Sequence, residues 1–127
     1  MAGIRPRQHL QILKGHGVSL PEWYVLSSIG MWPIPFSETS KIVASHSEGD
    51  PRGSVTERQC RDALAACIAT NWLRVMDKNS ITGLQALVAK KSLLGPIYGY
   101  PNPQDVDFTP NGASLYLRVR RQLTDGN

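Results

Sequence analysis

The sequence predicts a single α+β domain that is mainly helical and carries one small antiparallel β-hairpin. Three observations lead to this fold class. Apolar residues recur at spacings of three and four along most segments, which is typical of helices buried on one side. Only two short segments, 72–76 and 105–108, have the pattern of strands. The length of 127 residues suits one domain with one hydrophobic core, so residues 1–127 are expected to fold together.

The N-terminal part is expected to hold two helices. Residues 1–18 form an extension that can include a short helix. A longer helix is expected over 20–31, because Ser19 and Glu22 match a capping box, in which each side chain accepts a hydrogen bond from the other residue's backbone N–H. The inward positions are expected to be Leu10 and Leu13 in the extension, and Leu20, Trp23, Leu26 or Val25, and Ile29 in the helix.

Two further helices are expected after a break at two prolines. The first covers about 37–46, with Ser37 as its N-cap. The second covers about 56–70, where Thr56 and Gln59 match another capping box. Their inward residues are expected to be Ile42 and Val43 in the first, and Cys60, Ala63, Leu64, Cys67 and Ile68 in the second.

The two strands are separated by an unusually long insertion. Asn71 suits the left-handed end of the preceding helix, and 72–76 then forms the first strand. Residues 77–104 lie between the strands, and 82–94 has the pattern of a further helix. The second strand, 105–108, follows this insertion directly.

The last helix has the clearest start signal of the chain. It is expected over 110–123, with Thr109 as N-cap and Pro110 in the first helical position. The threonine hydroxyl can accept a bond from an unpaired N–H, and proline lacks the N–H that would be unpaired there. Its inward residues are expected to be Leu115, Tyr116, Val119 and Leu123.

Charge is modest overall but unevenly placed. The chain has a net charge of +4, and its pI of about 9.3 is compatible with nucleic-acid binding. Residues 48–62 carry four acidic and three basic side chains, so the middle of the chain attracts phosphate weakly. The basic clusters lie near the two ends of the chain and consist of Arg5, Arg7 and Lys14, and of Arg118, Arg120 and Arg121.

Several classes of protein are not indicated. No apolar run reaches the roughly 18 residues that a membrane span needs, and no secretory signal is recognisable, so a cytoplasmic protein is expected. Cys60 and Cys67 fall in one predicted helix and are too far apart for a disulfide within it. The three histidines share no metal-ligand spacing. We therefore expect no enzymatic activity, no metal and no cofactor.

The order of elements and three local motifs resemble winged-helix regulators of the MarR and PadR types. The motifs are a helix from Leu64 that ends at Asn71, the strand Leu73-Arg74-Val75, and the entry Phe108-Thr109-Pro110-Asn111-Gly112 to the last helix. The resemblance covers roughly residues 20–120. It implies a winged helix-turn-helix domain that binds double-stranded DNA as a transcription regulator, with 56–70 as the recognition helix and an unusually long wing.

The resemblance also implies which residues contact DNA. Arg58, Gln59 and Arg61 open the recognition helix, where side chains reach base edges in the major groove. Hydroxyl groups at the starts of two helices are candidates for phosphate contacts, and wing lysines for contacts to the DNA backbone. The hydroxyl candidates are Thr39, Ser40, Ser54 and Thr56, with Ser37, and the lysine candidates are Lys78, Lys90 and Lys91.

Each of these assignments has an alternative without DNA. Arg58 and Arg61 can belong to a solvated helix face with a Glu57–Arg61 pair, and Ser37 and Thr56 can act only as helix caps. Lys90 and Lys91 can lie on the exposed side of the inserted helix. The alternative function is a winged-helix protein–protein interaction module that does not bind DNA.

A homodimer is also expected, because regulators of this resemblance usually read two half-sites with a two-fold dimer. The terminal segments have more apolar residues than one core requires, and the arginines of the last helix would lie at the rim of the interface. The apolar residues concerned are Leu10, Ile12 and Leu13 at one end, and Leu115, Leu117, Val119 and Leu123 at the other.

Overall fold

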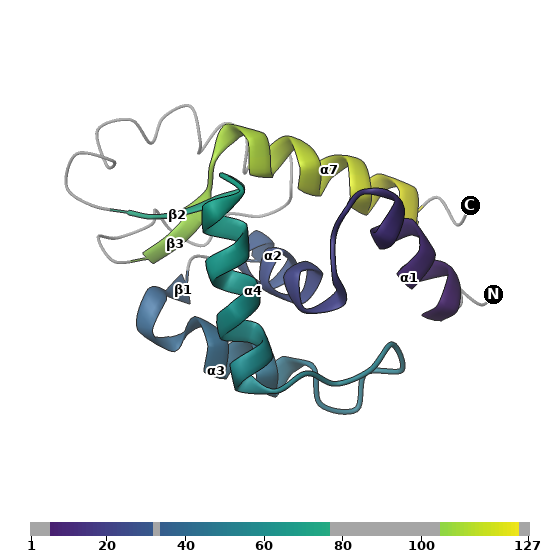
Figure 1. Cartoon of the computed structure of the whole chain (residues 1–127), viewed down its shortest axis with the longest axis horizontal. Helices are drawn as coiled ribbons and strands as arrows, with labels where there is room; N and C mark the ends of the chain where they lie inside the picture. The colour runs from purple at the N-terminus through teal and green to yellow at the C-terminus, as the bar shows by residue number, and fades with distance from the viewer. Residues whose placement is uncertain (1–5, 32–33, 77–104, 125–127) are drawn as a thin grey trace.

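The computed structural model describes residues 6–31, 34–76 and 105–124, which form five helices and one small sheet (Figure 1). The expected α+β class, mainly helical with antiparallel strands, is confirmed for these residues. The expected helix at 82–94 lies outside them. The helices are α1 (Pro6–Gly15), α2 (Leu20–Met31), α3 (Phe36–His46), α4 (Glu57–Ala69) and α7 (Pro110–Thr124), and the strands are β1 (Ile34–Pro35), β2 (Leu73–Val75) and β3 (Asp105–Phe108).

The sheet has three strands among the described residues, in the order β1-β3-β2, so the prediction of a two-stranded hairpin is wrong in this respect. All pairing is antiparallel, with Ile34 opposite Val106 and Leu73 opposite Phe108. The missed strand, β1, contains Pro35, one of the two prolines that predict a break after the first long helix. Proline is tolerated there because an edge strand needs hydrogen bonds on one side only.

One hydrophobic core joins the helices to the sheet. Helices α2, α3 and α4 pack on one another, and the side chains of β3 and α7 complete the cluster. Tyr116 of α7 stacks on Trp23 with ring centroids 5.0 Å apart and lies 5.3 Å from the ring of Phe108. The aromatic cluster therefore ties the last helix to both the first long helix and the sheet.

Three of the four predicted helix caps are confirmed. Ser19 and Glu22 exchange the two bonds of a capping box, and so do Thr56 and Gln59. The hydroxyl of Thr109 accepts a bond from the backbone N–H of Gly112 at 3.0 Å. Ser37 is not a cap, because α3 begins one residue earlier and Pro35 holds the N-cap position without a side-chain bond.

The start of α7 is fastened to the turn that follows α4. Asn71 has a φ of +66°, as expected for a left-handed helix end, and its carbonyl accepts a bond from the Thr109 hydroxyl. The Thr109 N–H donates to the carbonyl of Trp72 at 3.0 Å. A Cβ atom on Gly112 would lie 1.8 Å from that Trp72 carbonyl oxygen, so only glycine fits at this contact.

The two terminal helices, α1 and α7, lie side by side within one chain (Figure 1). Leu13, Leu115 and Val119 are buried, and Leu117 and Leu123 are partly buried against the core. Most of the apolar residues that suggested a dimer are thus covered within the chain, and the dimer itself stays a prediction. Leu10 does not face inward as expected, since it is 40% exposed.

Candidate nucleic-acid interface

Helix α4 has one buried and one open face. Cys60, Ala63, Leu64 and Cys67 are buried against α2, α3 and β2, as the sequence predicts. The open face combines two cations, two anions and two alanines, so its charges cancel. Its exposed residues are Glu57, Arg58, Arg61, Asp62, Ala65 and Ala69, together with Gln59 of the capping box.

The two arginines of this face are available to a partner. Arg58 is exposed, and Arg61 has a side chain that is 67% exposed. Glu57 lies one turn before Arg61, with 3.9 Å between the charged atoms, so the predicted pair forms in a loose geometry. Such an exposed pair contributes little to stability, because water and salt screen it. Arg61 can therefore break its ion pair with Glu57 at a small cost in free energy and contact a partner instead.

Gln59 is less suited to reading a base than the sequence suggests. Its side-chain oxygen accepts the N–H of Thr56 at 2.8 Å and thereby completes the capping box. Reading adenine would require both the oxygen and the nitrogen of the amide. Binding a base in that way would break the cap, so we remove Gln59 from the set of base contacts.

The hydroxyl candidates divide into two groups. Ser54 and Thr56 are exposed directly before α4, where a phosphate could approach them. Thr39 is fully buried, and its hydroxyl donates to the carbonyl of Pro35 at 2.8 Å. Ser40 is also buried. The expected phosphate contacts of Thr39 and Ser40 are therefore wrong, because both side chains belong to the interior of the helix packing.

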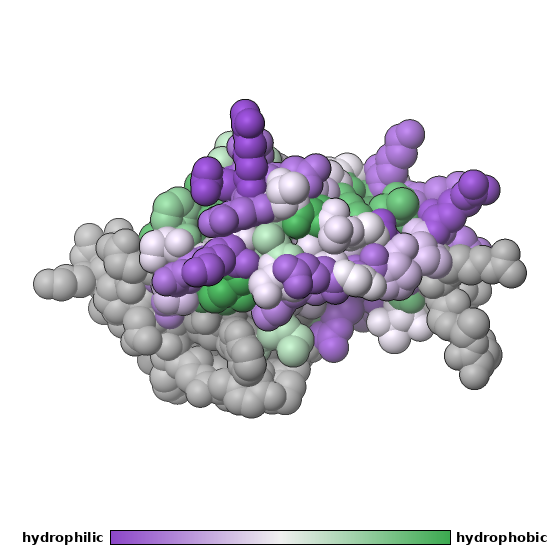
Figure 2. Space-filling model, turned by 90° about the horizontal axis from the view of Figure 1, so that it is seen from below, coloured by the Kyte–Doolittle hydropathy of each residue, from purple (hydrophilic) through white to green (hydrophobic). Residues whose placement is uncertain are grey.

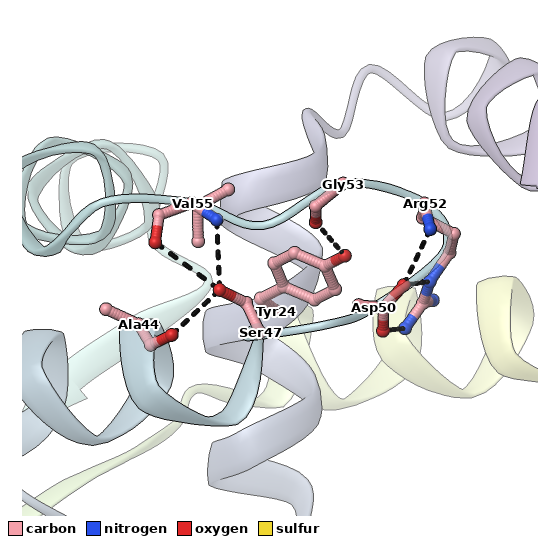
Figure 3. A network of polar contacts seen from close by, with 7 residues as sticks. All are labelled: Tyr24, Ala44, Ser47, Asp50, Arg52, Gly53 and Val55. Atoms are coloured by element: carbon pink, nitrogen blue, oxygen red, sulfur yellow. Dashed lines mark hydrogen bonds and ion pairs between the residues drawn. The ribbon is translucent and has the colours of Figure 1, made fainter.

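The loop that leads into α4 is held by an ion pair. Arg52 donates to both carboxylate oxygens of Asp50, at 3.0 and 2.9 Å, and its backbone N–H donates to the same carboxylate at 2.8 Å (Figure 3). These bonds outweigh partial burial and lower the pKa of Asp50 to about 2. The guanidinium also lies 5.1 Å from the centre of the Tyr24 ring. The loop is thus held against α2 by the contact between Arg52 and Tyr24.

Two further contacts fix the same loop (Figure 3). The Tyr24 hydroxyl donates to the carbonyl of Gly53 at 2.6 Å. Burial is the main reason why the pKa of Tyr24 is raised to about 12. The Ser47 hydroxyl accepts the N–H of Val55 at 2.9 Å. The sequence identified a loop here from its composition but gave no sign of the partners Tyr24 and Ser47, because these contacts are made only in the folded chain.

The connection between α3 and α4 is longer than that of a simple helix-turn-helix. Residues 47–56 separate the two helices, whereas a typical motif uses a turn of about three or four residues. The hydrogen bonds of Asp50, Tyr24 and Ser47 order this longer connection. The start of α4 is therefore held in place in spite of the length of the loop.

Among the coloured residues in the view from below, hydrophilic ones predominate and hydrophobic ones lie in separate areas (Figure 2). Of the exposed hydrophobic side chains, Met31 and Phe36 lie at opposite ends of the α2–α3 connection. Scattered apolar residues of this kind are normal on a protein surface.

The described residues offer neither a metal site nor a reactive thiol. No group of three or more His, Cys, Asp or Glu side chains lies close enough together in them to hold a metal ion. Cys60 and Cys67 are free and buried, and burial raises the pKa of both thiols, that of Cys67 to about 12. Thiols with raised pKa values are poor nucleophiles at neutral pH.

The wing candidates Lys78, Lys90 and Lys91 lie outside the described residues. Comparison of the chain with protein-family models, curated proteins and solved structures gave no match. In the part of the chain that the structure describes, no helix is long and apolar enough to span a membrane.

Proposed function

We propose that this chain is a winged-helix transcription regulator that binds double-stranded DNA without a catalytic step. In this proposal α4 enters the major groove, and the strands β2 and β3 form the base of the wing. The observation that carries the proposal is the placement of α4. It packs on α2 and α3 through one face, leaves the other face open, and is followed by β2, which pairs antiparallel with β3.

The chemistry of the open face fits this role in two ways. Arg58 and Arg61 lie in the first two turns of α4, the part of a recognition helix that contacts base edges. A guanidinium group can donate two parallel hydrogen bonds to guanine. Ala65 and Ala69 follow on the exposed side, and their small side chains allow the helix to approach the floor of a groove closely.

The proposal is tested by fluorescence polarisation with a pool of labelled duplexes at low and moderate salt. Binding should weaken steeply as salt rises, because phosphate contacts release counterions. Arg58→Ala combined with Arg61→Ala should lose about 1–3 kcal/mol of discrimination between sequences for each bidentate base contact. No binding of the unaltered chain at the lowest salt would refute the proposal.

A matched control separates base reading from simple charge. Arg58→Lys combined with Arg61→Lys keeps both positive charges but removes the planar fork that pairs with guanine. We expect this variant to keep its affinity for random duplexes and to lose sequence preference. If both the lysine variant and the alanine variant keep the sequence preference of the unaltered chain, the arginines do not read bases.

One observation favours a second candidate function, a protein-interaction module. A groove of about 310 Å³ lies beside α4, and its walls combine small or apolar side chains with two carboxylates. Carboxylates repel phosphate, so such a groove suits a peptide with basic residues better than DNA. Its lining residues are Ser19, Pro21, Glu22, Gln59, Asp62, Ala63 and Ala66. Failure to bind DNA, with binding of basic peptides that Asp62→Ala abolishes, would favour this candidate.

A further inference from the structure

The pair formed by α1 and α7 carries positive charge only. Neither Pro6–Gly15 nor Pro110–Thr124 contains an aspartate or a glutamate. The helices contact each other, and the imidazole of His16 is hydrogen-bonded to the side-chain oxygen of Gln122 at 2.7 Å. Five exposed cations lie on the pair, and they are Arg7, Lys14, Arg118, Arg120 and Arg121. This surface therefore has a charge that the balanced face of α4 lacks.

Between the two helices lies a groove of about 370 Å³. Three glutamine side chains and one histidine line it, together with a glycine and one isoleucine. The oxygen of Gln122 is bonded to His16, but its amide N–H groups and those of Gln11 can donate to phosphate or sugar oxygens. The lining residues are Gln8, Gln11, Ile12, Gly15, His16 and Gln122.

Helical spacing places the cations beside this groove. Arg7, Gln11 and Lys14 follow the spacing of one stripe on α1, at i, i+4 and i+7. On α7, Arg118 precedes Gln122 by four residues, which puts the two side chains on the same face. The glutamines Gln11 and Gln122 are thus each flanked by positive charge.

We propose that the α1–α7 groove is a second contact surface for nucleic acid, separate from α4, and that it binds the sugar–phosphate backbone. The cations at its edges neutralise phosphates, and the amides inside it hydrogen-bond to phosphate and sugar oxygens. The inference takes its class of partner from the proposed function but rests on other residues. It also supplies the attraction to phosphate that the neutral face of α4 cannot give.

The side chains of the groove favour nucleic acid over a membrane or a second copy. An acidic membrane surface is bound by a basic helix that also inserts a broad apolar face. Here Ile12 is the apolar side chain in the groove, and Leu10 is the exposed large hydrophobic residue of α1. A second copy docked on this surface would bring equal positive charges together, which costs free energy.

The test compares two pairs of charge-removing variants in polarisation titrations with a random-sequence duplex. Arg118→Gln combined with Arg121→Gln should weaken binding about tenfold at low salt and lower the slope of log affinity against log salt by about 2, since each phosphate contact contributes about 0.9. Arg7→Gln combined with Lys14→Gln should do the same from the other helix. Sequence preference should stay unchanged.

The matched control is Arg118→Lys combined with Arg121→Lys, which should keep the salt slope, because a phosphate contact needs only a positive charge. Circular dichroism of each variant checks that it is folded. An unchanged slope in both glutamine pairs would overturn the inference. A second result would also overturn it. If the glutamine variants lose binding to phosphatidylserine vesicles but keep their DNA affinity, the surface binds a membrane. If the unaltered chain has twice the chain mass of 14.0 kDa and the glutamine variants are monomers with intact DNA affinity, the surface is a dimer interface.

The results also separate this inference from the proposed function. If the α7 glutamine variant flattens the salt slope while the Arg58 and Arg61 variants change nothing, the groove binds DNA and α4 does not read it. If only the α4 variants have an effect, the groove inference fails and the proposed function stands. Complete absence of DNA binding in the unaltered chain would refute both.

Discussion

The open face of α4 and the α1–α7 groove both carry exposed arginines, but they differ in charge balance and in shape. On α4 two arginines are matched by Glu57 and Asp62, and small alanines lie between them and the end of the helix. The α1–α7 pair has no acidic residue and encloses an amide-lined groove. Base contacts specify a sequence, whereas phosphate contacts supply most of the affinity. If both surfaces bind DNA as proposed, this difference predicts that α4 supplies sequence selectivity and that the terminal helices supply affinity.

The largest expected effect lies at the junction between the two regions, where the start of α7 contacts Trp72 in the turn after α4. Gly112→Ala would place a Cβ 1.8 Å from the Trp72 carbonyl oxygen. We expect a loss of about 3 kcal/mol in the free energy of unfolding, because backbone on both sides must move. Gly15→Ala is the matched control, since nothing lies within 4 Å of a Cβ at that site. Equal denaturation midpoints for the two variants would contradict the tight junction.

The caps of α7 and α4 allow a second comparison of the two regions. The Thr109 hydroxyl is buried and makes two hydrogen bonds, to Gly112 and Asn71. Thr109→Ala should lower the free energy of unfolding by about 2 kcal/mol, whereas Thr56→Ala at the exposed cap of α4 should lower it by about 1 kcal/mol. Urea denaturation of both variants measures the difference. A larger loss for Thr56→Ala would show that the start of α4 is the more firmly held of the two.

A smaller effect is expected at the loop that precedes α4. Arg52 holds the pKa of Asp50 at about 2, below its ordinary value of 3.8. The ion pair therefore adds stability above about pH 4 that is lost as the pH falls towards 2. Asp50→Asn should be less stable than the unaltered chain at pH 5. The difference in free energy of unfolding between the two proteins should be smaller at pH 2, where Asp50 becomes protonated. Urea denaturation at both pH values measures this difference. If it is the same at pH 5 and pH 2, the charge of Asp50 does not hold the loop.

The smallest expected effect is a test of independence. If α4 and the α1–α7 groove contact DNA separately, the losses in binding free energy from their variants should add to within about 0.5 kcal/mol. The combined variant carries Arg58→Ala, Arg61→Ala, Arg118→Gln and Arg121→Gln. Its affinity, measured by polarisation beside the two parent variants, gives the coupling directly. A coupling well above this limit would mean that the two surfaces act as one site.

The elements with strong local signals were predicted well. The capping boxes at Ser19 and Thr56 and the Thr109 cap gave helix starts within one residue, because capping is decided by side chains close in sequence. The strand β1 was missed because it has only two residues, Ile34 and Pro35, and these carry no pairing signal of their own. It forms only because β3, some seventy residues later in the chain, offers an unpaired edge.

The candidate site was less predictable than the fold. Arg58 and Arg61 are exposed, as the reading of α4 required, but Thr39 and Ser40 are buried and Gln59 is engaged in its cap. A capping residue and a ligand-binding residue look the same in a sequence, because both are polar side chains at a helix start. The acid-free composition of the two terminal helices was visible from the sequence, yet it gained meaning only once the helices were found side by side.

By itself, the sequence determined the helix starts and the apolar stripes, since these follow from contacts among near neighbours. The need for glycine at position 112 comes instead from the Trp72 carbonyl, some forty residues earlier in the chain. The tertiary structure alone decided that a third strand joins the sheet, that Tyr24 holds the loop before α4, and that α1 lies against α7 to enclose the groove. The physical reason is the distance along the chain. These contacts join residues far apart in sequence, and their free energy is gained only when the whole core has assembled.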